Sequence, residues 1–132
     1  MTNNTDSIYR VIDANLNRLK EGLRVIEDIQ RYIFNDKKNS KKLKELRHLS
    51  SSIDIEYSKL LEFRDTNSDV LKATTKSEAS RTDLKSIQIA NFKRVQESAR
   101  VLEEILKLID VNQAEIFKTI RYEAYNIEKE LF

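Results

Sequence analysis

Two copies of one fifteen-residue block limit the folds open to this chain more than any other feature. The block that starts at Ala14 returns at Ala90, which is 76 positions later (90 minus 14). Both copies fit the pattern A-N-x-x-R-x-x-E-x-x-R-V-x-E-[D/E]. Core packing requires only that apolar positions stay apolar, yet here the polar residues return as the same types at the same spacing. We therefore expect two symmetric helices that share either a chemical role or a retained set of ion pairs.

Composition predicts that nearly the whole chain is helical. Its 132 residues contain one glycine, Gly22, and no proline, cysteine or tryptophan. A chain so poor in turn-forming residues, and so rich in good helix formers, is typical of an all-α protein. The length fits a single domain, residues 1–132. Without cysteine there are no disulfides and no thiolate chemistry, which is consistent with a reducing compartment.

The charge balance gives little reason to expect nucleic acid or membrane as a partner. Charged residues make up 35% of the chain, but the formal net charge is only +2. The N-terminus lacks the pattern of a signal peptide, and no apolar run has membrane-spanning length. We expect a soluble, cytoplasmic domain. The sequence has one basic run, interpreted as a solvated face because aromatic interleaving is missing: Lys37, Lys38, Lys41, Lys42 and Lys44.

Apolar spacing predicts four helices, over about 7–34, from the early forties to about 63, over about 81–109, and after a turn at 110–112. Residues 64–79 lack apolar periodicity and are interpreted as a linker between repeat halves 7–63 and 80–132. Arg47 and Arg121 follow the two copies at similar distances. The expected fold is an antiparallel four-helix bundle built from a duplicated helical hairpin, with an approximate internal two-fold axis.

Two repeated polar pairs are the first candidates for a site. Asn15 and Asn91 fall inside the apolar stripes of their helices, and Arg18 and Arg94 lie one turn further on at the stripe edge. One interpretation is structural, with the amides fixing the register of the bundle. The other is functional, with each amide binding a ligand and each arginine pairing with an anion. Small residues near the same faces favour close helix contact over room for a ligand: Gly22, Ser50 and Ser98.

The remaining repeated charges stand mostly away from the apolar stripe. Their spacing favours ion pairs on the helix surface, each worth a few tenths of a kcal/mol. A subunit interface, as in a homodimer, is the alternative. These residues are Glu21, Arg24, Glu27 and Asp28, with Glu97, Arg100, Glu103 and Glu104.

The linker carries residues suited to phosphate chemistry. Asp65 and Asp69 stand four apart in a polar segment and can hold Mg²⁺, which binds through few protein carboxylates and many phosphate oxygens. Asp and Ser also favour loops and caps, which is the more common reason for such a pattern. Three more residues precede the third helix, where its N-terminus offers a phosphate site: Ser77, Ser80 and Arg81.

Several catalytic classes find no support in the sequence. His48 is the only histidine, and nothing distinctive surrounds it. No nucleophile and base pair suggests a catalytic triad, and one glycine cannot form a glycine-rich phosphate loop. If the chain handles nucleotides, side chains and helix ends must bind them.

Taken together, the motifs resemble one family over almost the whole chain and in the same order. The resemblance is to the monofunctional hydroxymethylpyrimidine phosphate kinases of thiamine biosynthesis, a domain often fused to thiamine phosphate synthase. The synthase barrel is missing, so the chain looks like the standalone form. It departs from the family at Leu71, where members tend to place glycine. The motifs are the two repeated blocks, Leu46-Arg47-His48, Arg64-Asp65-Thr66, Asp69-Val70 and Arg121-Tyr122.

The resemblance implies phosphoryl transfer from ATP, with Mg²⁺, to 4-amino-5-hydroxymethyl-2-methylpyrimidine phosphate. The acceptor is already an anion, so the reaction needs positioning and charge neutralisation rather than a strong base. On this chemistry we expect Arg18, Arg94 and Asp65 to be catalytic and Asp65 and Asp69 to hold the metal. The expected substrate-binding residues are Asn15, Asn91, Arg47, Arg121, Arg64 and Arg81.

Two alternatives remain open from the sequence. A helical mutase of the chorismate type also holds a dianion with arginines, but it would need no ATP. A non-catalytic helical interaction module would keep the repeats for packing and present the basic run to a partner.

Overall fold

Aspartate side chains set the starts of three of the long helices. Asp36 accepts a hydrogen bond from the Asn39 amide at the start of α2, Lys37–Ser50. Asp83 and Ser86 form a reciprocal capping box at the start of α5, Leu84–Leu106. Asp110 accepts from the Asn112 amide at the start of α6, Val111–Leu131. Each cap satisfies amide groups that the helix leaves without an internal partner, so the chain has sharp helix starts although it contains no proline.

The computed structural model describes residues 4–75 and 80–132, and every regular element in these ranges is helical. The first helix, α1, spans Asn4–Asp28 and continues as a π-helical segment, η1, over Ile29–Ile33. A short helix, α3, spans Tyr57–Phe63. The prediction of an all-α protein is confirmed for this part of the chain.

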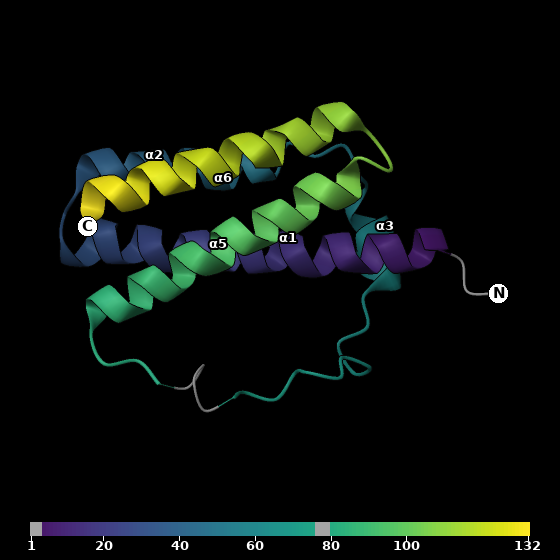
Figure 1. Ribbon diagram of the computed structural model, residues 1–132, viewed down its shortest axis with the longest axis horizontal. Coiled ribbons are helices and arrows are strands. Elements are labelled where there is room, and N and C mark those ends of the chain that lie inside the picture. Colours follow the sequence, from purple (N-terminus) through teal and green to yellow (C-terminus); the bar gives the residue numbers. More distant parts are fainter. Residues whose placement is uncertain (1–3, 76–79) are drawn as a thin grey trace.

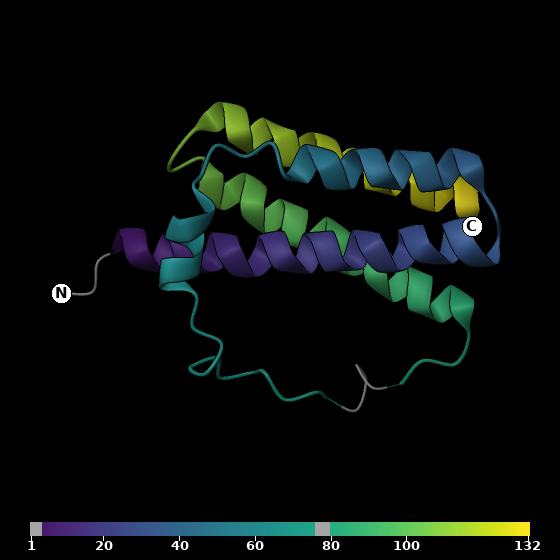
Figure 2. The same cartoon turned by 180° about the vertical axis from the view of Figure 1, so that it is seen from behind.

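The four long helices form two antiparallel hairpins, α1 with α2 and α5 with α6 (Figure 1). The hairpins pack with α1 against α5 and α2 against α6 (Figure 2). The core between them is apolar, with Ile12, Leu19, Leu23, Phe92 and Phe117 completely buried. None of the helices in the described ranges has the length and apolar character needed to cross a lipid bilayer. An origin of the two hairpins by duplication stays a prediction.

The expected second helix is interrupted, which adds α3 as a further helix to the predicted four. Ser50 donates its hydroxyl to the Arg47 carbonyl at 2.6 Å, and Ser52 donates to the Leu49 carbonyl at 2.7 Å. Such side chains compete with the helical backbone pattern, so the serine run ends α2. The chain resumes as α3, which packs on α1. Apolar spacing does not reveal this break because Ile53 still packs against the core.

The described part of the predicted linker, residues 64–75, leaves α3 and loops out on the side of α1 and α5 that faces away from α2 and α6 (Figures 1 and 2). The third helix begins at Leu84 and not at Arg81, because the capping box fixes its start. Part of the linker, residues 76–79 with the candidate Ser77, lies outside the described residues.

Candidate functional site beside the linker

Gly22 marks the close approach of α1 and α5. A Cβ atom built on it would lie 2.8 Å from Val95 Cγ2 and 3.2 Å from the Asn91 carbonyl oxygen. Real Cβ atoms are not found that close to a neighbour, so a hydrogen at this position lets the two repeated helices touch. The interpretation of Gly22 as a close-contact residue is confirmed.

Asn15 and Asn91 make the same hydrogen bond in the two copies. The Asn15 side-chain amide donates to the Val11 carbonyl at 2.9 Å, and that of Asn91 donates to the Ile87 carbonyl at 2.8 Å. Each amide is bound to its own helix four residues back. The two amides therefore make equivalent contacts within their own helices. A ligand role for these amides stays a prediction.

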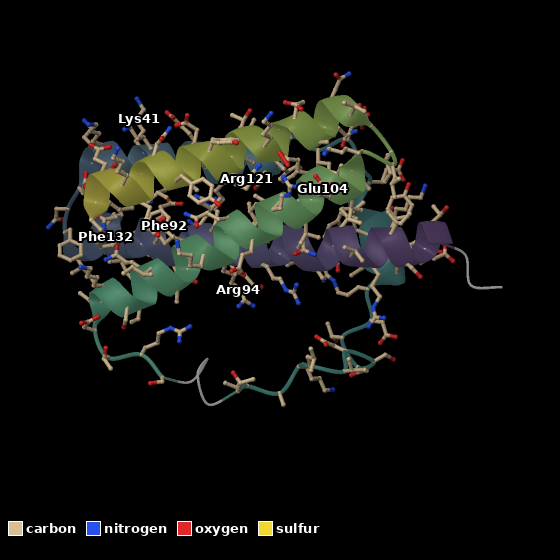
Figure 3. All side chains as sticks on the ribbon, in the orientation of Figure 1. Lys41, Phe92, Arg94, Glu104, Arg121 and Phe132 are labelled. Carbon is tan, nitrogen blue, oxygen red and sulfur yellow. The ribbon has the colours of Figure 1, made fainter. Side chains whose placement is uncertain are left out.

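Arg18 and Arg94 are exposed, not set into the edge of the core as the apolar spacing predicts. Within residues 4–75 and 80–132, neither guanidinium forms an ion pair, although both lie on helices rich in carboxylates. Arg94 projects from α5 on the side away from α6, where the linker runs (Figure 3). The two cations are therefore open to an anion from solution.

The start of the linker is bound to α1 by two arginines. Arg64 donates from Nε and Nη2 to the two oxygens of Asp13, both at 2.8 Å. Asp13 is only 5% exposed, so this is a partly buried bidentate pair, and it raises the pKa of Arg64. Arg10 donates to the Asp65 carbonyl at 2.9 Å. The acidic turn that follows is thus held beside the helix that carries Arg18.

Asp13 and Arg10 are not among the site residues expected from the sequence. Both residues lie just before the first copy of the repeated block. The residues 76 positions later are Ser86 and Ile89, so the second half has no matching charged pair. No local sequence pattern distinguishes Asp13 and Arg10 from other polar helix residues.

Asp65 and Asp69 each organise a turn. Asp65 accepts a hydrogen bond from the Ser68 amide at 3.0 Å, and Asp69 accepts from the Leu71 amide at 2.9 Å. The hydrogen bonds from Ser68 lower the pKa of Asp65 below its ordinary value, so this carboxylate stays ionised at neutral pH. Among the described residues, no group of three or more His, Cys, Asp or Glu side chains is placed to enclose a metal ion.

Arg81 is exposed before α5 and donates to the carbonyl of its neighbour Ser80 at 2.9 Å. This places a cation at the far end of the linker, near the N-terminus of α5. The other end holds Arg64 and Asp65. The linker therefore carries charged candidates at both of its junctions with the helices.

Arg47 and Arg121 lie elsewhere, each paired with a buried glutamate of the repeated block. Arg47 donates to Glu27 at 2.8 and 3.3 Å, and Arg121 donates to Glu103 at 3.3 and 3.4 Å. The two glutamates are 1% and 4% exposed. The prediction that these repeated carboxylates lie on the surface is wrong for Glu27 and Glu103. Each glutamate faces the second helix of its own hairpin, where an arginine neutralises it.

Arg121 also lines a pocket of about 360 Å³ between α5 and α6. Burial alone would lower the pKa of Arg121, but the hydrogen bond and charge of Glu103 raise it overall. Its Nε is buried without a partner in the described structure. Arg121 lies between α5 and α6, whereas Arg94 points to the opposite side of α5 (Figure 3). The structure thus separates Arg94, which lies on the side of α5 where the linker runs, from Arg121, which lies between α5 and α6 (Figure 3).

These features define an all-helical protein with an acidic turn bound to α1 and with exposed arginines at the repeated positions of α1 and α5. The chain belongs to the ThiD2 family, whose model matches residues 10–130. The match includes both repeated blocks, the start of the linker and Arg121.

Curated relatives match nearly the whole chain. It is 39% identical over 125 residues to a protein named thiamine-phosphate synthase from Nostoc punctiforme, and 38% identical over 126 residues to one of the same name from Synechocystis. A third, from Rhodopirellula baltica, is 38% identical over 135 residues. These matches cover 94%, 95% and 99% of this chain but only 35% to 36% of the relatives, so the chain spans about a third of their length. No solved structure matches.

Proposed function

We propose that this chain is an enzyme of thiamine biosynthesis that transfers a phosphoryl group from ATP to hydroxymethylpyrimidine phosphate, giving the diphosphate. The observation that carries the proposal is the anchoring of the Asp65 turn on α1 by Arg10 and Arg64. That anchoring sets an ionised carboxylate beside the helix with Asn15 and Arg18. Family membership and the relatives' names support the pathway.

The proposed reaction requires the protein mainly to position the two substrates and to neutralise the charge of their phosphate groups. An oxygen of the substrate's phosphate attacks the γ-phosphorus of ATP, the bond from that phosphorus to the bridging oxygen breaks, and ADP leaves. The attacking oxygen is already anionic at neutral pH, so no strong base is required. Negative charge is crowded around the transferring group, and guanidinium groups stabilise it.

We assign the stabilisation of that charge to the two exposed arginines of the repeat, Arg18 and Arg94. The surface of α1 and α5 that carries them is called the linker face. Arg18 and Arg94 would bind phosphate oxygens, since neither is neutralised by a carboxylate within the described part of the chain. Arg10 and Arg18 are eight residues apart, which is roughly 12 Å along α1, and this leaves room for phosphate groups between the acidic turn and Arg18. The remaining binding roles fall to Asn15, Asn91 and Arg81. Arg64, expected from the sequence to bind substrate, is assigned to anchoring the linker, because its Nε and Nη2 already donate to the buried Asp13.

The linker carboxylates fit the way proteins hold Mg²⁺. This ion takes one or two carboxylates and completes its shell with phosphate oxygens and water, so it does not need a cluster of three acidic residues. Asp65 and Asp69 are both exposed and can supply those carboxylates. When bound, Mg²⁺ would neutralise charge on the phosphates.

For Arg47 and Arg121 we propose a positioning role in place of the phosphate contact expected from the sequence. Their guanidinium groups already face buried carboxylates. Withdrawing either one for a ligand would leave a charged glutamate in the core, which is a costly change.

The direct test is to incubate the purified chain with ATP, Mg²⁺ and the pyrimidine phosphate, and to measure ADP and the pyrimidine diphosphate. We expect equal amounts of both products, and no turnover of the unphosphorylated alcohol, which would leave the arginines unpaired. Arg94→Met is the variant expected to lose activity. ADP no higher than with denatured protein would overturn the proposal.

Thermal unfolding with candidate ligands separates the rival functions. A ligand that binds only the folded state raises the melting temperature. ATP with Mg²⁺ should stabilise a kinase, and a chorismate analogue should stabilise a mutase. An interaction module should respond to neither.

A further inference from the structure

The basic run of α2 is divided by the fold into two sets of lysines. Lys38 and Lys42 face α6 and donate to the two oxygens of Glu130 at 2.6 and 3.1 Å. Lys37, Lys41 and Lys44 lie along a different stripe of the helix, since residues spaced by three and four share a face. Within residues 4–75 and 80–132, no carboxylate comes within ion-pair distance of these three. The basic run therefore contains two lysines that are neutralised by Glu130 and three that have no carboxylate partner among the described residues.

The unneutralised lysines line a pocket of about 470 Å³ formed by η1, the turn after it and α2. Arg31, on the π-helical segment, adds a fourth cation to the same wall, and it also forms no ion pair with the described residues. A pocket of this volume is within the range that holds small ligands. Lys41 projects from α2 on the side away from α5 (Figure 3), so this pocket is separate from the linker face.

Local backbone geometry brings these cations together. The chain leaves α1 through a π-turn in which the Phe34 amide donates to the Ile29 carbonyl at 3.2 Å. Asn35 then takes a φ of 52°, a left-handed conformation that asparagine tolerates better than most residues. π-helical turns occur often at functional sites because they change the direction of side chains. Here the turn sets Arg31 opposite the lysines of α2.

The acidic groups at the pocket are already occupied. Glu27 is held by the bidentate pair with Arg47. Asp36 caps α2, and hydrogen bonds from Asn39 lower its pKa. The four cations therefore outweigh the carboxylates that are free to balance them. The pocket is also at the N-terminus of a fourteen-residue helix, the end that favours an anion.

Ser40 adds a polar group to the wall of the pocket. It is 9% exposed and lines the pocket, and its hydroxyl has no hydrogen-bond partner in the described structure. A buried hydroxyl without a partner costs free energy unless something binds it. A change of rotamer would present this hydroxyl to an anion held by the lysines.

We propose that this pocket binds the phosphate groups of a small phosphorylated ligand, through Arg31, Lys37, Lys41, Lys44 and Ser40. The ligand class is a phosphate oxyanion, whether it comes as free phosphate or as the polyphosphate chain of a nucleotide. The proposal does not depend on kinase activity. It is tested without Mg²⁺ and without the pyrimidine, so its outcome is independent of whether phosphoryl transfer occurs.

The experiment is a titration of the full chain with orthophosphate, tripolyphosphate and ATP, followed by backbone amide NMR shifts. We expect tripolyphosphate to shift the amides of Ser40 and Lys41 along one saturable curve. ATP binding clearly tighter than tripolyphosphate would assign the site to a nucleotide, because the nucleoside then adds contacts. Orthophosphate binding as tightly as tripolyphosphate would assign it to free phosphate. No saturable shift at these amides with any of the three probes would overturn the proposal.

Two variants of one helix give a matched comparison. Lys41→Gln removes a pocket lysine, and Lys42→Gln removes an equal charge that faces Glu130. We expect Lys41→Gln and Ser40→Ala each to weaken tripolyphosphate binding about three- to tenfold, while Lys42→Gln changes it less than about twofold. Equal weakening by the two lysine variants would show a diffuse basic surface and would reject the site. Circular dichroism of each variant confirms that the helices are intact.

Discussion

Arg47 neutralises Glu27 from the neighbouring helix, with its Nε 2.8 Å from one carboxylate oxygen. The pair links α2 to α1 in the first hairpin, and Arg121 with Glu103 links α6 to α5 in the second. The sequence separations, twenty and eighteen residues, are nearly equal. The repeated glutamate therefore has the same structural partner in both halves. This accounts for one polar position of the repeat by structure alone.

Removing the arginine of this pair should destabilise the protein severely. Arg47→Met leaves the Glu27 carboxylate, which is 1% exposed, with only Arg24 at 3.7 Å. Breaking a buried ion pair costs about 3–5 kcal/mol, so we expect the free energy of unfolding in urea to fall by about 3 kcal/mol. Arg24→Met is the matched control, and its exposed contact should matter by less than about 1 kcal/mol. Equal losses in both variants would contradict a special role for Arg47.

Gly22→Ala should also destabilise the fold, although alanine is the better helix former. The new Cβ would lie 2.8 Å from Val95 Cγ2, and Val95 is stiff because it is β-branched. We expect a net loss of about 1–3 kcal/mol from overpacking, after a gain of up to about 1 kcal/mol in helix propensity. Urea unfolding measures it. Ser98→Ala, at the matching position of the second copy, is the control, and a combined Gly22→Ala and Val95→Ala variant should recover part of the loss.

These two sites show what the sequence could and could not reveal. The role of Gly22 was predictable, because glycine weakens a helix and its place on the apolar side indicates that a neighbouring helix comes close. The burial of Glu27 and Glu103 was not. Periodicity within one helix shows how far a residue lies from the apolar stripe of that helix. Whether a residue at the edge of the stripe is buried depends on which neighbouring helix covers it. The arginine that covers each glutamate comes from another helix, and no local sequence pattern predicts this pairing.

The same limit applies to the candidate site. The linker was predictable as a long polar segment between the two hairpins, and its role in a site stays a prediction. Its attachment to α1 was not predictable. In the sequence, Asp13 looks like any other polar residue on a helix. Its partner Arg64 is fifty-one residues away, so only the folded structure shows the pair. The break in α2 was likewise hidden, because three consecutive serines do not disturb an apolar spacing that resumes at Ile53.

The linker attachment predicts a local change in backbone protection. Arg64→Met removes both hydrogen bonds to Asp13, so the turn from Asp65 to Leu71 should open more often. We expect faster amide hydrogen exchange at Ser68 and Leu71, with little change in the α5 amides. In the unaltered chain, ATP with Mg²⁺ should slow exchange at the same two amides if the linker closes on a nucleotide. Exchange at Ser68 and Leu71 that is the same in the variant as in the unaltered chain would rule out the anchor.

Asp36 should give α2 a pH-dependent contribution to stability. Hydrogen bonds from Asn39 favour its ionised form and lower its folded-state pKa below the ordinary value for aspartate. A lowered pKa contributes stability above the unfolded-state value, and that stability is lost as the pH falls through the folded-state pKa. Asp36→Ala should therefore cost about 1 kcal/mol at pH 7, as for other lost caps, and less at about pH 3. Urea unfolding at both pH values tests this, and a cost that grows in acid would contradict it.

Arg18 and Arg94 are predicted to serve activity and not folding. Both are exposed, and neither is neutralised by a carboxylate among the described residues, so Arg→Met at either position should change the free energy of unfolding by no more than about 0.5 kcal/mol. Truncating a charge-assisted contact to phosphate costs about 1.5–3 kcal/mol, so kcat/KM for the proposed kinase reaction should fall roughly ten- to hundredfold. Lys118→Met, an exposed cation on α6, is the control and should leave both quantities unchanged. If the arginine variants keep full activity, or if they unfold where Lys118→Met does not, the repeated arginines are structural and the linker face is not the site of phosphate binding.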